Sequence, residues 1–315
     1  MTRKIFFDLV EIRTKLASFF PFLIAVLFTN TYFHLFHWGK TLFFFFGMIA
    51  FDMATMAINN YMDFRKAHSE EYKYQENIIG KAQLSKRTVV MIIFGLIGFS
   101  AIVGITLAIQ TGWLLLVMGC ACCFIGVFYT FGPIPLSRMP LGEVFSGVTM
   151  GLGIFAITVY LNTYDKKLFF MELDLQHFAI TGSTTAALAV VWASIPLIAT
   201  IANIMLANNL CDLEQDIENH RYTLPFYLGK KNAVILFNLL MYGSYLAIVI
   251  GLITGIYQWP ILITFLSLLK VYPQTKAFTK EQIKHKTFAM SIKNLVAFNG
   301  RYALGLLVTL FWQLI

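Results

Sequence analysis

Nine long apolar runs divide this sequence, and they constrain its fold more than any other feature. Most of them reach the roughly 17–25 residues that a helix needs to cross a bilayer. Hydrophobic residues make up 58% of the chain and charged residues only 13%, so a soluble fold is excluded. We expect an all-α, polytopic membrane bundle of nine transmembrane helices that forms a single domain over residues 1–315. The runs cover residues 16–36, 41–61, 88–109, 113–131, 141–161, 185–208, 233–253, 259–272 and 295–314, of which the eighth is short.

The distribution of Lys and Arg predicts the orientation of the chain, because cytoplasmic loops retain positive charge. With the N-terminus inside, the inside segments hold 20 of the 24 basic residues, whereas the outside segments hold only Lys40, Lys166 and Lys167. We therefore expect a multi-pass protein of the cell membrane with a cytoplasmic N-terminus and an outside C-terminus. The net charge of +8 then reflects orientation in the lipid bilayer, and we expect no nucleic-acid partner, since no compact basic and aromatic platform accompanies it.

Two copies of the pattern N-N-x-x-D stand at the ends of the second and sixth runs, and they are the most specific feature of the chain. The spacing puts amide and carboxylate oxygens three to four residues apart, on one face of a helix. Four spans separate the two motifs, so both emerge on the same face of the membrane and can share a site. The motif residues are Asn59, Asn60 and Asp63 in the first copy and Asn208, Asn209, Asp212 and the following Asp216 in the second.

Oxygen ligands of this kind suit Mg²⁺ that is bound jointly with a substrate phosphate, because Mg²⁺ keeps several waters and takes one or two carboxylates. The pattern therefore indicates a diphosphate substrate. The alternative is that both motifs are only polar helix ends that cap at the membrane interface. The metal ligands that we expect are Asn59, Asp63, Asn209, Asp212 and Asp216.

Basic residues accompany both motifs. Arg65 and Lys66 follow the first, and Arg221 lies five residues after Asp216. Arginine suits bidentate binding of phosphate and lysine acts as a point charge, so these side chains could hold a leaving diphosphate. Membrane-adjacent Lys and Arg also act as topology determinants, and that alternative stays open for Arg65.

Asp52 lies inside an apolar run, where a carboxylate is costly and should have a partner. It precedes Asn59 and Asp63 by seven and eleven residues, about two and three helical turns, so the three side chains fall nearly on one line. We interpret Asp52 as a polar floor of the same cavity. The alternative is a neutral, protonated Asp with a structural role.

Residues 129–143 contain three Pro and two Gly between the fourth and fifth runs, which predicts a rigid loop without helix on the inside. Tyr129 ends the fourth run and Glu143 begins the fifth, so both are expected at the level of the acidic motifs. A plain turn is the alternative.

Together these residues resemble the UbiA superfamily of intramembrane aromatic prenyltransferases, and within it the 1,4-dihydroxy-2-naphthoate polyprenyltransferases of menaquinone biosynthesis. The first-loop pattern of the family, N-D-x-x-D followed by another acid, is met at Asn59 and Asp63. Residues 129–143 are most similar to the naphthoate branch, and residues 13–18 also resemble the first helix of the family. The second-loop pattern, N-x-x-D-x-x-x-D with a basic stretch and Thr-Leu, is met at Asn209, Asp212, Asp216, Arg221, Thr223 and Leu224.

The resemblance implies a central cavity that opens to lipid, under a cytoplasmic cap made by the loops after helices 2 and 6. It implies that Mg²⁺ and a polyprenyl diphosphate bind there, and that the allylic cation is attacked by an aromatic acceptor, most closely dihydroxynaphthoate, which loses its carboxylate. The implied catalytic residues are Asp63, Asp212, Asp216 and Arg221. The residues implied in binding the diphosphate and its metal are Lys15, Asn59, Asn60, Lys66, Tyr129, Arg138 and Asn209.

Several positions depart from the family pattern. Asn60 stands where the family usually has Asp, Ser69 stands near the place of the last acid with Glu70 next to it, and His220 and Tyr222 replace Gly and Lys. The first motif is thus short of carboxylates. Either the remaining oxygens, with or without Glu70, still hold a metal, or metal affinity is weaker, or the substrate has changed.

Three other functions stay open at this point. Prenylation of hydroxybenzoate or haem is possible within the same family. A transporter is the alternative from another class, because two symmetric polar motifs can form an ion site. A relative without catalytic activity is the third, and the missing acids of the first motif are the reason to consider it.

Overall fold

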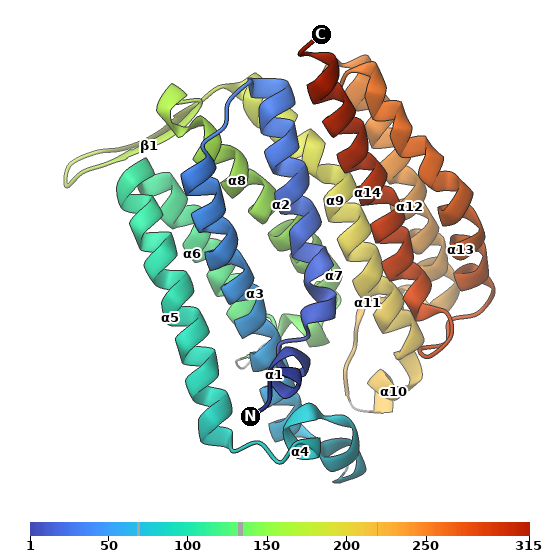
Figure 1. Cartoon of the computed structure of the whole chain (residues 1–315). Coiled ribbons are helices and arrows are strands. Elements are labelled where there is room, and N and C mark those ends of the chain that lie inside the picture. Colours follow the sequence, from blue (N-terminus) through green and yellow to red (C-terminus); the bar gives the residue numbers. More distant parts are fainter. Residues whose placement is uncertain (68–69, 132–134, 219) are drawn as a thin grey trace. The chain divides into compact units, whose positions relative to one another are not determined.

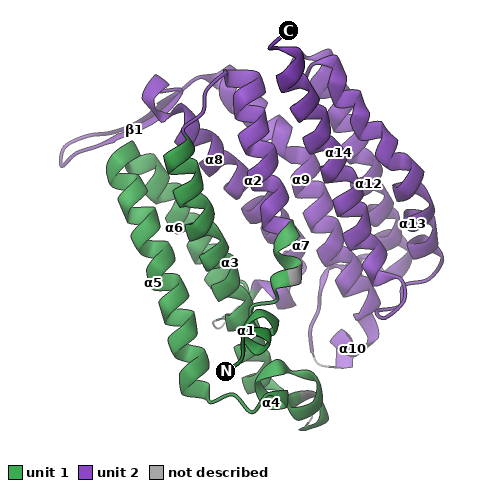
Figure 2. Cartoon of the chain, in the orientation of Figure 1, with its two compact units in different colours: residues 1–16, 38–135 green, residues 17–37, 136–315 purple. Residues whose placement is uncertain are grey.

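The computed structural model describes residues 1–67, 70–131, 135–218 and 220–315, and its backbone is mostly helical (Figure 1). The chain separates into two compact units (Figure 2). Unit 1 comprises Met1–Leu16 and Trp38–Pro135, and unit 2 comprises Ala17–His37 and Leu136–Ile315. The first motif therefore belongs to unit 1 and the second to unit 2. The expectation of a single domain stays a prediction.

Unit 1 is built on the long helix α3, which packs against α5. The Ser85 hydroxyl accepts a hydrogen bond from the backbone N–H of Thr88 and starts α5, and Gly112, at φ 116°, separates α5 from α6. Buried side chains from α1, α3, α4 and α5 form a small core around the end of α3. The label η marks short segments of 3-10 or π-helix. The elements are α1 (Arg3–Leu9), η1 (Ile12–Lys15), α3 (Trp38–Lys66), η3 (Tyr72–Glu76), α4 (Ile78–Lys81), α5 (Lys86–Thr111) and α6 (Trp113–Phe128).

Unit 2 is a larger bundle, and its central helix α9 contacts η5, α12 and α14. Its helical elements before the hairpin are α2 (Leu16–Phe28), η2 (Thr29–Phe33), η4 (Leu136–Arg138), α7 (Gly142–Ser146), η5 (Gly147–Gly153), α8 (Ile154–Thr163) and η6 (Tyr164–Lys166). Those after it are α9 (Thr184–Cys211), α10 (Leu213–Glu218), α11 (Leu224–Leu228), α12 (Lys230–Ile253), η7 (Trp259–Ser267), α13 (Leu268–Lys280) and α14 (Phe288–Trp312).

Glycines allow η5 to lie directly against α9. A Cβ atom on Gly151 would lie 2.6 Å from the backbone nitrogen of Ile198, and one on Gly147 would lie 2.8 Å from the Ile198 carbonyl oxygen. Small residues that let two backbones approach closely are typical of helix contacts in membranes. This contact fixes the segment that precedes α8 against the helix that ends in the second motif.

Seven helical segments within the described ranges are long and apolar enough to cross a membrane, and the chain is a multi-pass membrane protein. The segments are Leu16–Phe33, Trp38–Lys66, Lys86–Thr111, Gly142–Lys166, Thr184–Cys211, Lys230–Ile253 and Phe288–Trp312. The fourth run forms the shorter helix α6, and the eighth is divided between η7 and α13, with Pro260 and Pro273 in these elements. Nine spans are therefore not confirmed, and the cytoplasmic cap stays a prediction.

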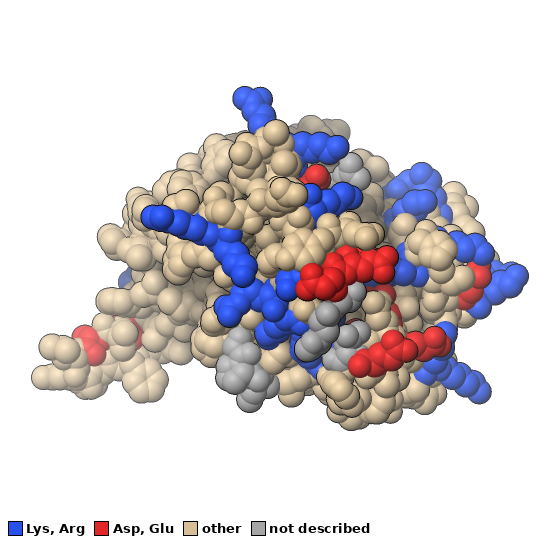
Figure 3. All heavy atoms as spheres, turned by 90° about the horizontal axis from the view of Figure 1, so that it is seen from below, with Lys and Arg blue, Asp and Glu red and all other residues tan. Residues whose placement is uncertain are grey.

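The long segments after α3 and α9 carry short helices, η3 and α4 in the first and α10 and α11 in the second. Charged side chains are exposed on the face seen from below in Figure 3. The inside orientation of the N-terminus and the outside orientation of the C-terminus stay predictions.

A β-hairpin follows η6, so the expectation of an all-helical chain is wrong for this segment. Strands β1 (Phe169–Leu173) and β2 (Phe178–Gly182) pair antiparallel, with Phe169 opposite Gly182. The carboxylate of Asp174 accepts hydrogen bonds of 2.7 Å from the backbone N–H groups of Gln176 and His177, which lower its pKa and fix the turn. Two five-residue strands give too short an alternation to stand out beside the long apolar runs.

We expect Gly151→Ala to lower the free energy of unfolding by about 1–3 kcal/mol, because the added methyl group would overlap the backbone of α9. Gly243→Ala is the matched control in α12, since a Cβ there meets no described atom within 4 Å and Ala favours a helix. Thermal unfolding in detergent checks both variants. Equal melting temperatures for the two would contradict the close contact of η5 and α9.

Candidate functional site

The first motif occupies the last turns of α3, where Arg65 and Lys66 complement the helix dipole. The Asn59 side-chain oxygen accepts a hydrogen bond of 3.1 Å from the hydroxyl of Thr130. Tyr129, the neighbour of Thr130, caps α6. Within unit 1 the structure thus brings the first motif and the residue after Tyr129 together, as expected for the end of the fourth run. Asp63 and Lys66 are half-buried.

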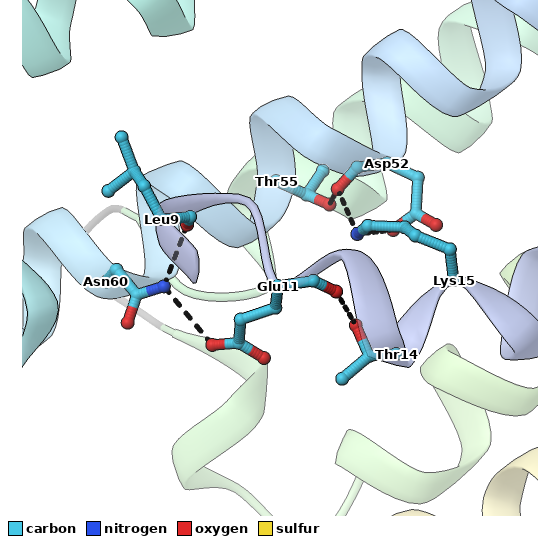
Figure 4. A network of polar contacts seen from close by, with 7 residues as sticks. All are labelled: Leu9, Glu11, Thr14, Lys15, Asp52, Thr55 and Asn60. Atoms are coloured by element: carbon cyan, nitrogen blue, oxygen red, sulfur yellow. Dashed lines mark hydrogen bonds and ion pairs between the residues drawn. The ribbon is translucent and has the colours of Figure 1, made fainter. Parts of the chain in front are cut away.

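Asn60 links the motif to the N-terminal segment rather than to an open site (Figure 4). Its amide nitrogen donates to the carbonyl oxygen of Leu9 at 3.0 Å and to the carboxylate of Glu11 at 3.2 Å. The amide of Asn77 in turn donates to the Asn60 carbonyl at 3.0 Å. A carboxylate at position 60 could not donate these bonds, which gives a physical reason for Asn in place of the usual Asp. The side-chain nitrogen of Asn60 is engaged in these bonds, and its role in binding the diphosphate stays a prediction.

Glu11 is a site residue that the sequence analysis missed. It adopts a left-handed backbone conformation, with φ 48° and ψ 56°, which is uncommon for a residue with a side chain. Burial raises the pKa of its carboxyl group; Asn60 and Lys15 lower it, whereas Asp63 and Asp52 raise it. Glu11 therefore lies within electrostatic reach of Asp63. Its only signal in the sequence is an acid in the short segment before the first run.

Asp52 has the partner that its position in an apolar run requires. The Lys15 ammonium lies 2.8 Å from its carboxylate and 3.0 Å from its carbonyl oxygen, and both side chains are nearly buried, at 8% and 11% exposed. Figure 4 shows this pair beside the contacts of Glu11 and Asn60. The structure pairs the charge of Lys15 with Asp52, and the binding of diphosphate by Lys15 stays a prediction. Asp52 thus has a partner within this unit.

The possible extra acid of the first motif is not at the site. The carboxylate of Glu70 is 78% exposed and faces the Lys73 ammonium at 3.8 Å. Ser69 lies outside the described residues. Within the described part of unit 1, Asp63 and Glu11 are the carboxylates associated with the motif.

The second motif begins in the last turns of α9. The buried amide of Asn209 donates to the Glu143 carboxylate on α7 at 2.8 Å. This contact confirms that Glu143 lies at the level of the second motif. The side-chain nitrogen of Asn209 already donates to Glu143. The predicted metal contact of Asn209 would therefore come from its side-chain oxygen.

Asn208, one residue earlier, and Asp212 both contact the side chain of Lys284. The ammonium of Lys284 donates to the Asn208 side-chain oxygen at 2.6 Å and forms an ion pair with the Asp212 carboxylate. Lys284 belongs to the segment between α13 and α14. In the sequence, Lys284 is one of several basic residues of a loop. No spacing along the chain connects it to the motif.

Asp216 and Arg221 form the last part of the second motif. The guanidinium Nε of Arg221 lies 3.4 Å from Oδ1 of Asp216, and the Arg221 backbone N–H donates to the Asp216 carbonyl at 2.8 Å. The Asp216 side chain is only 6% exposed, and burial raises the pKa of its carboxyl group, whereas Arg221 and, more weakly, Arg138 lower it. Its Oδ2 atom has no hydrogen-bond partner among the described residues.

The structure thus brings the predicted residues together in two sets. Unit 2 holds Asn209, Asp212, Asp216, Arg221 and Arg138, with Glu143, Asn208 and Lys284 added. Unit 1 holds Asn59, Asp63, Lys66 and Tyr129, with Glu11 added. No group of three or more His, Cys, Asp or Glu within the described ranges is placed to hold a metal ion. The expectation that both motifs share one pocket stays a prediction.

We expect Asn60→Asp to destabilise the protein by about 1–3 kcal/mol. The substitution removes the part-buried amide donor of Asn60 and places a new carboxylate beside that of Glu11. Adding Glu11→Gln should recover part of this loss, since the glutamine amide can donate to the new carboxylate. A double-mutant cycle of thermal unfolding measures the coupling. Strictly additive losses would show that the two side chains do not interact.

A model of the UbiA prenyltransferase family matches residues 18–295. A curated relative, 1,4-dihydroxy-2-naphthoate octaprenyltransferase from Bacillus subtilis (strain 168), is 26% identical over 317 residues, which cover 98% of this chain and 94% of the relative.

Two solved structures are similar in fold at low sequence identity. A UbiA homolog from Aeropyrum pernix K1 has a TM-score of 0.66 at 12% identity, over 95% of this chain and 98% of that one. A UbiA homolog from Archaeoglobus fulgidus, bound to GPP and Mg²⁺, has a TM-score of 0.61 at 9% identity, over 98% and 99% of the two chains. At such identities the likeness concerns the fold alone.

Proposed function

Because the chain belongs to the UbiA prenyltransferase family, we propose that it transfers a polyprenyl group from an allylic polyprenyl diphosphate to an aromatic acceptor. The family transfers prenyl groups, and the match covers most of the chain. The observation that carries the chemical part of the proposal is Asp216, a buried carboxylate beside an arginine, in a motif that also contains Asp212.

Dihydroxynaphthoate is the acceptor that we propose, with loss of its carboxylate, as a step of menaquinone biosynthesis. The support is the likeness to the Bacillus subtilis enzyme over nearly the whole length of both chains, together with residues 129–143. Hydroxybenzoate and haem precursors are the alternative acceptors. They differ from dihydroxynaphthoate in the ring that must reach the allylic carbon.

The second motif fits a divalent cation bound with a diphosphate. Oδ2 of Asp216 is buried and finds no hydrogen-bond donor among the residues described, and a buried acceptor of this kind is costly unless a ligand satisfies it. The GPP and Mg²⁺ of the Archaeoglobus fulgidus homolog support Mg²⁺ as the cation. Bound Mg²⁺ would neutralise charge on the departing diphosphate. We propose Asn59, Asp63, Asn209, Asp212 and Asp216 as its ligands.

Basic side chains near the motifs would hold the diphosphate. Arg221 is oriented by Asp216 and by the Ser137 carbonyl, which its Nη2 approaches at 3.5 Å, and the charge of Arg138 acts on the same carboxylate. Guanidinium groups bind phosphate oxygens in a bidentate manner. In unit 1 we propose Lys66 for the same role and the ring of Tyr129 as a shelter for the allylic cation.

Two buried contacts of the site would act by positioning. Glu143 fixes Asn209 through a hydrogen bond of 2.8 Å, and Lys15 neutralises Asp52 in the apolar run. We propose that the Lys15 and Asp52 pair forms the polar floor beneath the first motif. Both pairs are set in place before any substrate binds, so little reorganisation is needed on binding.

The position of the motifs argues against a transporter. Both stand in the last turns of the long helices α3 and α9 and lead into segments with exposed charges, whereas transport sites lie near the middle of broken membrane helices. A diphosphate, which is strongly charged, binds more readily at such helix ends than within the hydrocarbon region.

Asp63→Ala and Asp212→Ala should each reduce prenyl transfer by at least about a hundredfold, because each removes a carboxylate from the metal and diphosphate site. Membrane insertion should be unchanged, and Glu70→Ala, which alters an exposed acid, should retain full activity. Membranes that contain each variant are assayed with radiolabelled geranylgeranyl diphosphate, dihydroxynaphthoate and Mg²⁺. Full activity in either aspartate variant would remove the metal assignment.

The acceptor is tested separately. Quinones are extracted from cells with and without this chain, and purified protein is assayed with dihydroxynaphthoate and with 4-hydroxybenzoate in parallel. We expect the prenylated naphthohydroquinone to form with release of carbon dioxide and diphosphate, and oxidation by air during extraction converts it to the quinone. Prenylated hydroxybenzoate as the main product would keep the reaction class and replace the acceptor, and no product with any acceptor would favour a relative without catalytic activity.

A further inference from the structure

The Lys284 ammonium makes a contact that the proposed reaction does not explain. It binds two oxygens of the second motif at once, the Asn208 side-chain oxygen at 2.6 Å and the Asp212 carboxylate. These two residues are four positions apart at the end of α9, so their oxygens form a pair on one side of the helix. A single positive charge therefore fills the place between an amide oxygen and a carboxylate.

A structured turn presents Lys284 to the motif. The hydroxyl of Thr287, which is 1% exposed, donates to the Glu281 carbonyl at 2.9 Å and accepts from the Ile283 backbone N–H at 2.9 Å. The Lys284 ammonium also lies 5.1 Å from the centre of the Phe288 ring. Nearby Lys286 has another partner, the Glu281 carboxylate at 2.5 Å. The turn thus selects one of its two lysines for the motif.

From this geometry we propose that Lys284, held in place by Asn208, is a built-in counter-cation of Asp212, which a divalent cation must displace before Asp212 can bind it. The inference rests on the proposed function, because it assumes that the second motif binds a metal. It assigns to Lys284 the role of setting the metal affinity. Lys284 is not proposed as a metal ligand or as a catalytic residue.

The ammonium group and a metal ion exclude each other on these oxygens. Each carries positive charge, so the two cations repel each other when both lie against one carboxylate, and an Mg²⁺ ion at about 2.0–2.1 Å from its oxygens disfavours an ammonium group on the same side chain. The apparent dissociation constant is then the intrinsic one divided by the fraction of molecules in which the pair is open.

The expected effect is modest because the ion pair is partly exposed. The Lys284 and Asp212 side chains are 46% and 22% exposed, and such pairs contribute little. We expect the apparent affinity to change by about two- to fivefold. Oδ2 of Asp216 has no hydrogen-bond donor within the described chain, so the competition concerns Asp212.

The first test measures Mn²⁺ binding directly by electron paramagnetic resonance, with the full-length protein in nanodiscs. Lys284→Met should bind Mn²⁺ about two- to fivefold more tightly than the unmodified chain. Lys286→Met removes the same charge from the same turn but touches Glu281 and not the motif, so it should leave the affinity unchanged. An equal increase of Mn²⁺ affinity in both variants would reflect the loss of net charge alone. A lower Mn²⁺ affinity in Lys284→Met would mean that Lys284 helps the metal to bind. Either result overturns the proposal.

The second test follows the lysine itself. Amine labelling resolved by mass spectrometry, with and without saturating Mg²⁺, should show that Lys284 becomes more reactive when the metal binds while Lys286 stays constant. Unchanged Lys284 reactivity, with Mn²⁺ binding demonstrated, overturns the inference and leaves the proposed function intact. Absence of Mn²⁺ binding in every variant, also with inorganic pyrophosphate present, overturns the metal site and the inference together.

Discussion

The cost of placing charge in hydrocarbon governs this molecule. A membrane helix satisfies its own backbone, so the apolar runs become helices, and a carboxylate inside a run must come with a counter-charge. Asp52 meets this requirement through Lys15, and the remaining acids of the two motifs lie at helix ends. The same cost explains why the motif side chains are tied to neighbours: Asn60 to Glu11, Asn209 to Glu143, and Asp216 to Arg221.

The two motifs share a sequence pattern but differ in their surroundings. In the first, an amide donates to a carboxylate brought by the N-terminal segment, and Asp63 is the motif's own acid. In the second, two aspartates face three basic side chains from separate segments, Arg138, Arg221 and Lys284. Identical spacing therefore occurs once with a single carboxylate of its own and once with two aspartates that lie beside basic side chains.

The sequence was sufficient to predict the helices and the motifs because both depend on local spacing. Apolar runs of bilayer length and the i, i+4 relation of Asn208 and Asp212 can be derived from neighbours along one helix. Lys284 and Glu11 could not be found in this way, since only the fold brings them to residues more than 40 positions away. The eighth run is not confirmed as a span, because it is shared between η7 and α13. The short hairpin lacked a strong pattern in the sequence.

The bond from Asn60 to the carbonyl of Leu9 connects the end of α1 directly to the first motif. A tag or fusion partner attached next to α1 is consequently expected to disturb the motif. A displacement of α1 would break the bond to α3, the helix that carries Asp63. Natural variation should follow the same rule, with residues 11 and 60 exchanging in concert during divergence.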